Sequence, residues 1–155
     1  MEILSFYFMV DIELIKQLRE ETGISLGECK KALEEGKTVE KAKEILKKWG
    51  KELAAKKEDR QTGQGKVASY IHANGKIGVL IELRCETDFV ADSADFENLS
   101  HELCLQIAAM GGEAENILEQ PWIKDSSKSV KDLINETVAK VGENIVLQKA
   151  ARFQI

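Results

Sequence analysis

The sequence predicts an α+β protein in which a module of helices precedes an antiparallel sheet with packed helices. Apolar residues recur at helical spacing up to Gly50. From Lys66 the period changes to two, and Asn74-Gly75 is typical of a type I′ hairpin turn. Residues 144–155 begin with a segment of strong β preference. The hairpin and this last strand predict a three-stranded antiparallel sheet with helices on one face.

The first part of the chain has the start and stop signals of three short helices. Asp11, Ser25 and Thr38 are N-cap candidates, and Glu28 follows Ser25 at the spacing of a capping box. Helices this short are unstable alone, so we expect them to share one small core. Glycines are predicted to end the three helices: Gly23, Gly36 and Gly50.

We divide the chain into four segments. Residues 1–9 are interpreted as an extension, because Met9 has the appearance of a natural start. Residues 10–51 form the helical module, 52–65 a linker, and 66–155 an α+β core.

The glycines before Lys66 allow two interpretations. Gly63-Gln64-Gly65-Lys66 could be taken for a phosphate-binding loop, but the full spacing G-x-x-x-x-G-K-[ST] is missing and no strand is predicted before it. A flexible linker is the better interpretation.

Two longer helices are predicted between the hairpin and the last strand. The first follows a cap at Asp92 or Ser93, and the second starts with a capping box of Ser129 and Asp132. Residues 120–122 contain the only proline and are predicted as an extended loop. The pairing expected across the hairpin sets two pairs on one face: Tyr70 with Val79 and Ala68 with Ile81.

The charge and composition of the chain argue against nucleic-acid binding and membrane association. The 155 residues carry a formal net charge of -5, so a basic field for nucleic acid is absent and no direct nucleic-acid binding is expected. No apolar run approaches the roughly 20 residues of a membrane span, so no membrane association is expected. Three cysteines without paired spacing fit reduced thiols and a cytoplasmic location.

Catalytic and metal sites have weak support. Cys85 could act as a thiol nucleophile with His72 or His101 as its base, but no spacing pairs them, and Cys85 is more simply a core residue. The histidines and cysteines lack the ligand spacing of a metal site, and no cofactor is expected. Trp122, in the loop after the proline, is left open between packing and a partner contact.

The segment 85–91, Cys-Glu-Thr-Asp-Phe-Val-Ala, joins an apolar strand to a predicted helix. It places an acid and a large aromatic side by side at a strand-to-helix turn. In one interpretation Phe89 projects as an apolar wedge with the Asp88 charge beside it, to be buried in a partner. In the other, Phe89 turns inward and Asp88 caps the helix.

Four blocks of the sequence resemble the bacterial translation elongation factor Ts family. In family order they are residues 18–23 with 29–33, 67–72, 85–91, and 120–125 with 142–145. The resemblance implies that the helical module is a ubiquitin-associated-type three-helix fold. It also implies a guanine nucleotide exchange factor that binds elongation factor Tu and promotes GDP release during translation elongation. Such a protein acts by binding and is not an enzyme.

The resemblance also implies the partner-binding residues. In the family the aspartate and phenylalanine of the Thr-Asp-Phe-Val motif penetrate near the nucleotide site, which implicates Thr87, Asp88, Phe89 and Val90. The N-terminal module supplies a second contact, around Arg19 and Thr22. Only residues 111–119 stand where typical members have a long stretch, as in short members that form a homodimer. The alternative is a ubiquitin-associated-like adaptor that binds a partner without exchange activity.

Overall fold

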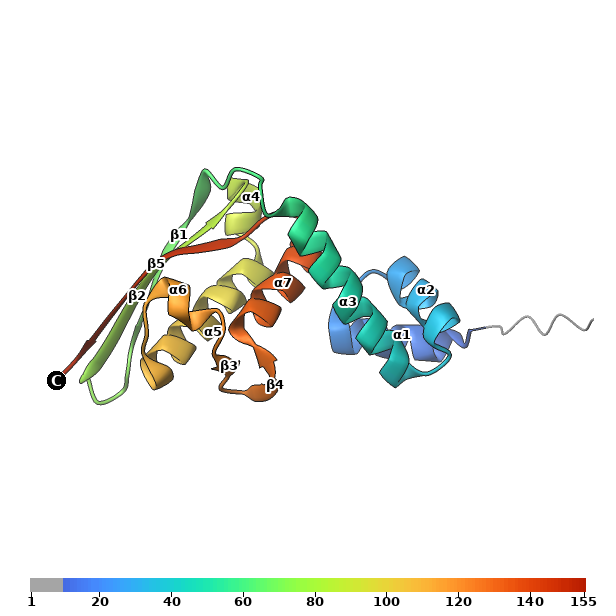
Figure 1. Ribbon diagram of the computed structural model, residues 1–155, viewed down its shortest axis with the longest axis horizontal. Coiled ribbons are helices and arrows are strands. Elements are labelled where there is room, and N and C mark those ends of the chain that lie inside the picture. Colours follow the sequence, from blue (N-terminus) through green and yellow to red (C-terminus); the bar gives the residue numbers. More distant parts are fainter. Residues whose placement is uncertain (1–9) are drawn as a thin grey trace, which may run out of the picture. The chain divides into compact units, whose positions relative to one another are not determined.

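A computed structural model describes residues 10–155 and confirms the predicted α+β class (Figure 1). The interpretation of residues 1–9 as an extension lies outside the described residues. The chain divides into two compact units, one ending at Gly50 and the other comprising Lys51–Ile155. Along residues 10–155, no helix is long and apolar enough to cross a membrane.

The first unit contains α1 (Ile12–Thr22), α2 (Leu26–Gly36) and the first part of α3 (Val39–Lys57). The three predicted caps are confirmed, because Asp11, Ser25 and Thr38 each accept a backbone N–H from the turn that follows. The Glu28 carboxylate accepts the Ser25 hydroxyl at 2.9 Å. The three helices share a small core, as expected: Leu18, Cys29, Ala32, Leu33, Ala42 and Leu46.

Two predicted helix ends are wrong. Gly36 is the last residue of α2, and Lys37 takes the left-handed conformation instead, with φ 65°. Gly36 serves a close approach, since a Cβ there would lie 2.8 Å from the Ala42 nitrogen. Helix α3 passes through Gly50 and ends at Lys57. Strong helix formers after Gly50 outweigh the cost of about 1 kcal/mol for one interior glycine.

The second unit is built on a three-stranded antiparallel sheet of order β1-β2-β5. The strands are β1 (Gln64–Ile71), β2 (Ile77–Cys85) and β5 (Val146–Gln154). The predicted register is confirmed, because Tyr70 pairs with Val79 and Ala68 with Ile81. On central β2 buried and more exposed residues alternate, so the sheet has an inner face and an outer face.

The hairpin turn differs from the predicted type I′. That type needs positive φ at two central residues, yet Lys37 is the only non-glycine with positive φ among residues 10–155. The Gly75 amide instead donates to the His72 carbonyl at 2.7 Å, and Asn74 Oδ1 accepts the Lys76 amide at 3.0 Å. The connection is longer and held by the asparagine side chain, and the strand register is the same.

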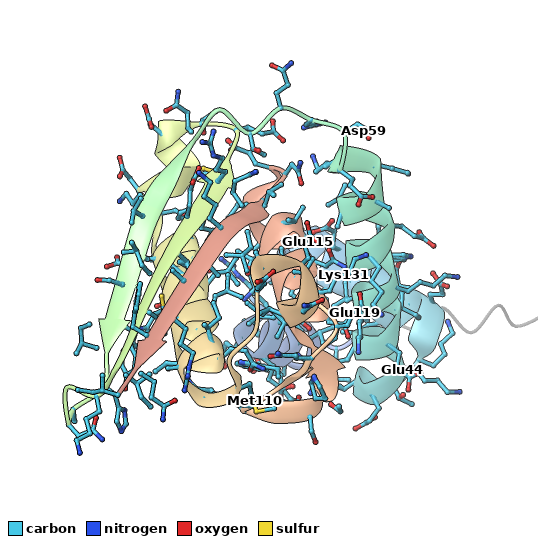
Figure 2. All side chains as sticks on the ribbon, turned by 60° about the vertical axis from the view of Figure 1, so that its left-hand side comes forward. Glu44, Asp59, Met110, Glu115, Glu119 and Lys131 are labelled. Carbon is cyan, nitrogen blue, oxygen red and sulfur yellow. The ribbon has the colours of Figure 1, made fainter. Side chains whose placement is uncertain are left out.

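Helices cover the inner face of the sheet (Figure 1, Figure 2). Helix α5 (Ala94–Met110) packs on β1 and β2 and against α7 (Val130–Val141), and α6 (Ala114–Ile117) lies against β5. The largest fully buried side chains of this core include Phe96, Leu103 and Ile107 of α5. The remaining elements are α4 (Asp88–Ala91), β3 (Pro121–Trp122) and β4 (Asp125–Ser129).

The predicted extended loop at 120–122 belongs to a small second sheet, in which β3 pairs with β4. A buried glutamine of α5 holds this segment. Gln106 Nε2 donates to Gln120 Oε1 and to the Pro121 carbonyl, both at 3.1 Å, and its Oε1 accepts the Ile123 amide at 2.9 Å. Because all three hydrogen bonds are made inside the protein, this polar side chain is stable in the core.

Candidate partner-binding site

The turn between β2 and α5 forms a one-turn helix, α4, that sequence analysis did not predict. Thr87 is its N-cap, and the Val90 amide donates to the Thr87 hydroxyl at 3.3 Å. Asp88 lies in the first turn, where a negative charge is favourable. The interpretation of Asp88 as the helix cap is therefore wrong, because Thr87 has that place.

Phe89 projects outward from α4, and 86% of its surface is exposed. The interpretation in which Phe89 turns inward is therefore wrong. The next two residues face the other way: Val90 is 4% exposed and Ala91 2%. Successive residues of a helix point about 100° apart, so one turn cannot bury all four side chains. Packing Val90 and Ala91 into the core leaves Phe89 in solvent.

A glutamate from the loop after α7 supports this turn. Glu143 Oε2 accepts the Glu86 amide at 3.0 Å and the Thr87 amide at 2.9 Å. Its Oε1 accepts the Thr87 hydroxyl at 2.5 Å. Sequence analysis missed this role, although residues 142–145 belong to one of the blocks that carry the family resemblance. No local pattern around Glu143 indicates this role, because the residues that it contacts are 56 and 57 positions away in the sequence.

A carboxylate of the loop before α4 also binds the backbone of the loop after α7. Glu86 Oε1 accepts the Asn144 amide at 2.8 Å and lies 3.7 Å from an Arg60 guanidinium nitrogen. The Asn144 side chain donates to the carbonyls of Glu58 and Arg60, at 3.1 and 3.0 Å. Three segments distant in sequence therefore meet beneath the Phe89 turn.

The predicted contacts of the N-terminal module lie in the first unit. Arg19 is exposed on α1. Thr22 is half-buried, and its hydroxyl donates to the Leu18 carbonyl at 2.6 Å and accepts the Ile24 amide at 3.3 Å. Arg19 thus presents its side chain to solvent, while the Thr22 hydroxyl is used in shaping the end of α1.

The position of Cys85 in the structure is unsuitable for a thiol nucleophile. Its side chain is fully buried, its thiol donates to the Thr87 carbonyl at 3.2 Å, and burial raises its pKa. Neutral thiols are poor nucleophiles. His72 bonds to the Tyr70 hydroxyl at 3.0 Å, and His101 meets the Tyr70 ring edge-on. Among residues 10–155, no group of three or more potential ligands could hold a metal ion.

The outer face of the sheet carries several large apolar side chains that are exposed to solvent. It carries no helix in the part of the chain that the structure describes (Figure 1). A shallow cavity of about 370 Å³ lies over the hairpin end of this face. The large apolar side chains exposed on or beside the face are Val67, Ile71, Leu80, Phe153 and Ile155.

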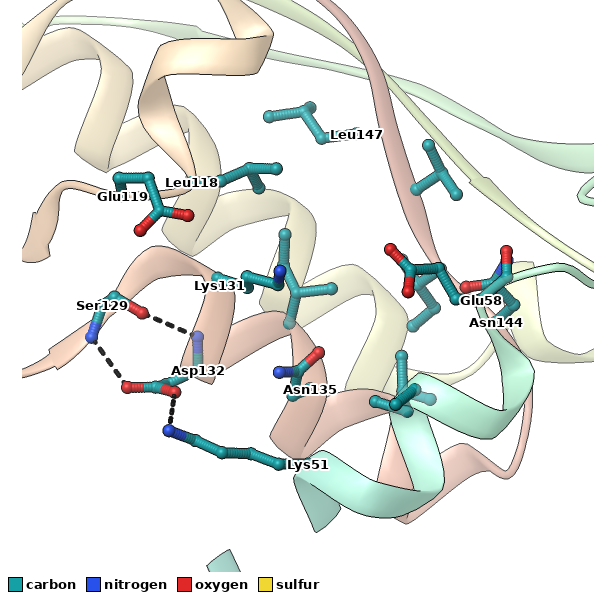
Figure 3. A pocket seen from close by; sticks show the side chains of 16 residues that line it. Lys51, Glu58, Leu118, Glu119, Ser129, Lys131, Asp132, Asn135, Asn144 and Leu147 are labelled. Carbon is teal, nitrogen blue, oxygen red and sulfur yellow. Dashed lines mark hydrogen bonds and ion pairs between the residues drawn. The ribbon is translucent and has the colours of Figure 1, made fainter. Parts of the chain in front are cut away.

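A second cavity, of about 600 Å³, lies between the end of α3, α7 and β5 (Figure 3). Its apolar lining includes Leu118, Ile134 and Leu147. At its rim Lys51 pairs with Asp132 at 2.9 Å. Trp122, left open by the sequence, lies outside this cavity and is only partly exposed.

Comparison with known proteins gives one consistent result. A family model described as elongation factor TS matches residues 86–155. The elongation factor Ts of Coprothermobacter proteolyticus is 41% identical over an alignment of 193 residues, which covers 94% of this chain and 98% of that protein. The proteins of the same name from Thermoanaerobacter sp. and Thermosipho melanesiensis are 38% and 37% identical, over 94% and 95% of this chain and 95% and 99% of their own lengths.

These alignments are longer than the 155 residues of this chain, so the relatives have residues that it lacks. The relatives nevertheless match along nearly their whole length. The residues matched by the family model, 86–155, contain both Phe89 and Glu143. The chain therefore belongs to the elongation factor Ts family of translation elongation factors.

Proposed function

We propose that this protein is a guanine nucleotide exchange factor that binds elongation factor Tu and accelerates the release of GDP during translation elongation. Family membership supports the partner and the process. The observation that carries the proposal is the position of Phe89. This large aromatic side chain is 86% exposed, whereas the next two residues of α4, Val90 and Ala91, are buried in the core. Buried aromatic anchors of this kind dominate the energetics of protein interfaces.

Exchange follows from differential binding. If the factor weakens the affinity of the partner for GDP, then GDP weakens the affinity for the factor by the same ratio. The factor must therefore make contacts in a partner conformation that GDP disfavours. Phe89 is suited to wedge between elements near the phosphate and magnesium site. Asp88, exposed beside it, brings a negative charge that competes with phosphate or disturbs the magnesium.

The other candidate residues have distinct parts in this proposal. Thr87 caps the turn, and Val90 anchors it from within the core, so the Val90 contribution is positional. Arg19, exposed on α1, is the residue of the N-terminal module that meets the partner. Thr22 shapes the backbone beside it through its two hydrogen bonds. That module is proposed to be ubiquitin-associated-like, in line with its three short helices around one core.

The outer sheet face is proposed to bind a second copy of this chain, giving a homodimer. A contiguous apolar face of this kind marks an interaction site. The same face carries both signs of charge: Glu82 lies 2.5 Å from Arg84 and 3.8 Å from Lys149. Self-complementary charge suits a two-fold interface, in which each copy presents the same patch. The short segment 111–119, where we place the residues that relatives have in addition, fits a core completed by a partner copy.

We propose that the protein works in the cytoplasm, where its partner acts, and that it acts by binding without bond chemistry. The test is the release of fluorescently labelled GDP from elongation factor Tu, chased with unlabelled nucleotide, with and without this protein. Release accelerated at least tenfold is expected. The alternative, an adaptor without exchange activity, predicts equal affinity for the GDP-bound and nucleotide-free partner and an unchanged release rate.

A further inference from the structure

Glu143 accepts three hydrogen bonds from Glu86 and Thr87, the two residues that come directly before α4. We infer that it is a positioning residue for exchange: it holds Thr87 in the conformation that presents Phe89, and it acts through that turn. This inference rests on the proposed exchange function and adds to it a residue on a different loop. Glu143 is separated from Thr87 by 56 positions, so only the fold brings the two together.

The Thr87 hydroxyl connects Glu143 to the first turn of α4. A threonine hydroxyl has one proton to donate and two lone pairs to accept with. The Thr87 hydroxyl donates its proton to Glu143 Oε1, and its lone pair accepts the Val90 amide that starts α4. The carboxylate therefore fixes the rotation of the hydroxyl, and this rotation aims a lone pair at the first turn of α4. Removing the carboxylate releases the proton to point elsewhere and loosens the cap.

The backbone of the turn is fixed by the same carboxylate. Glu86 and Thr87 both donate their amides to Glu143 Oε2, at 3.0 and 2.9 Å. These two amides come directly before α4 and set the direction in which its single turn begins. Hydrogen bonds to an ionised acceptor are stronger than neutral ones, so one side chain fixes three donors of two consecutive residues.

Glu143 is itself held in place. It follows Gly142, the left-handed end of α7 at φ 77°, and the Gly142 carbonyl accepts Lys57 Nζ at 2.8 Å. Its neighbour Asn144 donates its amide to Glu86. The loop after α7 and the loop before α4 thus each supply a carboxylate, from Glu143 and Glu86, that accepts backbone amides of the other loop. A reciprocal pair of this kind can transmit the position of the α7 end to the Phe89 turn.

The first test measures the turn directly. In Glu143→Ala, we expect amide hydrogen exchange at Glu86 and Thr87 to accelerate at least tenfold, measured by NMR, with the sheet amides unchanged. Glu143→Gln keeps one carbonyl oxygen as an acceptor and should give an intermediate rate. Glu115→Ala, at an exposed glutamate of α6 labelled in Figure 2, is the matched control and should leave both amides at the wild-type rate. Wild-type exchange rates in Glu143→Ala would overturn the inference.

The second test measures exchange on elongation factor Tu. Glu143→Ala should reduce stimulated GDP release about fivefold to tenfold, with partial rescue in Glu143→Gln. In a Phe89→Ala background the same change should cause a clearly smaller loss, because the part of its effect that passes through the ring is already absent and only the part through Asp88 is left. A full additional loss in that background would show a direct contact of Glu143 with the partner and overturn the positioning role.

The two tests separate this inference from the function on which it rests. If the wild-type protein fails to accelerate GDP release, the exchange function falls. The amide measurements still decide whether Glu143 fixes the turn.

Discussion

Removing the Phe89 ring should separate folding from exchange. The ring is 86% exposed, so Phe89→Ala removes almost no contact inside the protein. Exposed substitutions change stability by about 0.5 kcal/mol or less. Burying a phenylalanine side chain in a partner contributes about 1.5–3 kcal/mol. If the ring is buried only in the state from which GDP leaves, its loss slows stimulated release by about 10- to 150-fold, since about 1.4 kcal/mol is tenfold.

The assay follows labelled GDP leaving elongation factor Tu at several factor concentrations, so that weaker binding and slower release are resolved. Thermal unfolding of the variant should match the wild type within about 2 °C. Met110→Ala is the matched control, because Met110 at the end of α5 is also a large exposed apolar side chain, 57% exposed (Figure 2). It should release GDP at the wild-type rate. Wild-type release in Phe89→Ala would refute the wedge.

Three further predictions concern association and stability. Phe153→Glu places a charge on the outer sheet face and should halve the mass found by light scattering at micromolar concentration; an unchanged mass would exclude this face as the dimer interface. Gln106→Leu leaves the Ile123 amide and the Pro121 carbonyl without their partner, and should lower the free energy of urea unfolding by about 2–4 kcal/mol. Burial raises the pKa of Cys104 to about 11 from an ordinary 9.0, so its contribution to stability is complete below pH 9 and is lost towards pH 11, as the unfolded thiol ionises first. Between pH 9 and pH 11 the free energy of unfolding of Cys104→Ala should therefore decrease less than that of the wild type. An equal decrease in the two proteins would contradict the raised pKa of Cys104.

Much of the fold could be predicted because its signals are local. The caps at Ser93 and Ser129 were each recognisable from a hydroxyl residue before an apolar stripe, and both are confirmed. The strand register could be predicted because a shift by one residue would turn the apolar face of β2 towards solvent. Ser129 and Asp132 form the complete capping box that their spacing indicated.

The errors share a physical cause, which is competition that a local pattern does not reveal. Gly50 is a helix-ending residue in isolation, but the Ala54 side chain that follows is buried in the core of the second unit, so α3 continues. Asn74-Gly75 favours a two-residue turn, yet the asparagine side chain offers the backbone a different closure. At the candidate site the motif could be found from sequence, whereas Glu143 could not be assigned, because its partners are 56 and 57 positions away.

The direction of Phe89 follows from what surrounds it. A short turn with two apolar residues buried must direct the other side of its helix into solvent, and here Val90 and Ala91 fill the inward positions. The backbone that carries the exposed ring is already fixed by the fold, so binding has to order only the Phe89 side chain and not the turn. More of the binding free energy is then left to distort the partner. An exchange factor depends on that difference, since contacts that form equally with the GDP-bound state shift nothing. The hydrogen bonds beneath the turn are therefore expected to contribute to exchange by fixing this backbone, although less than the ring itself does.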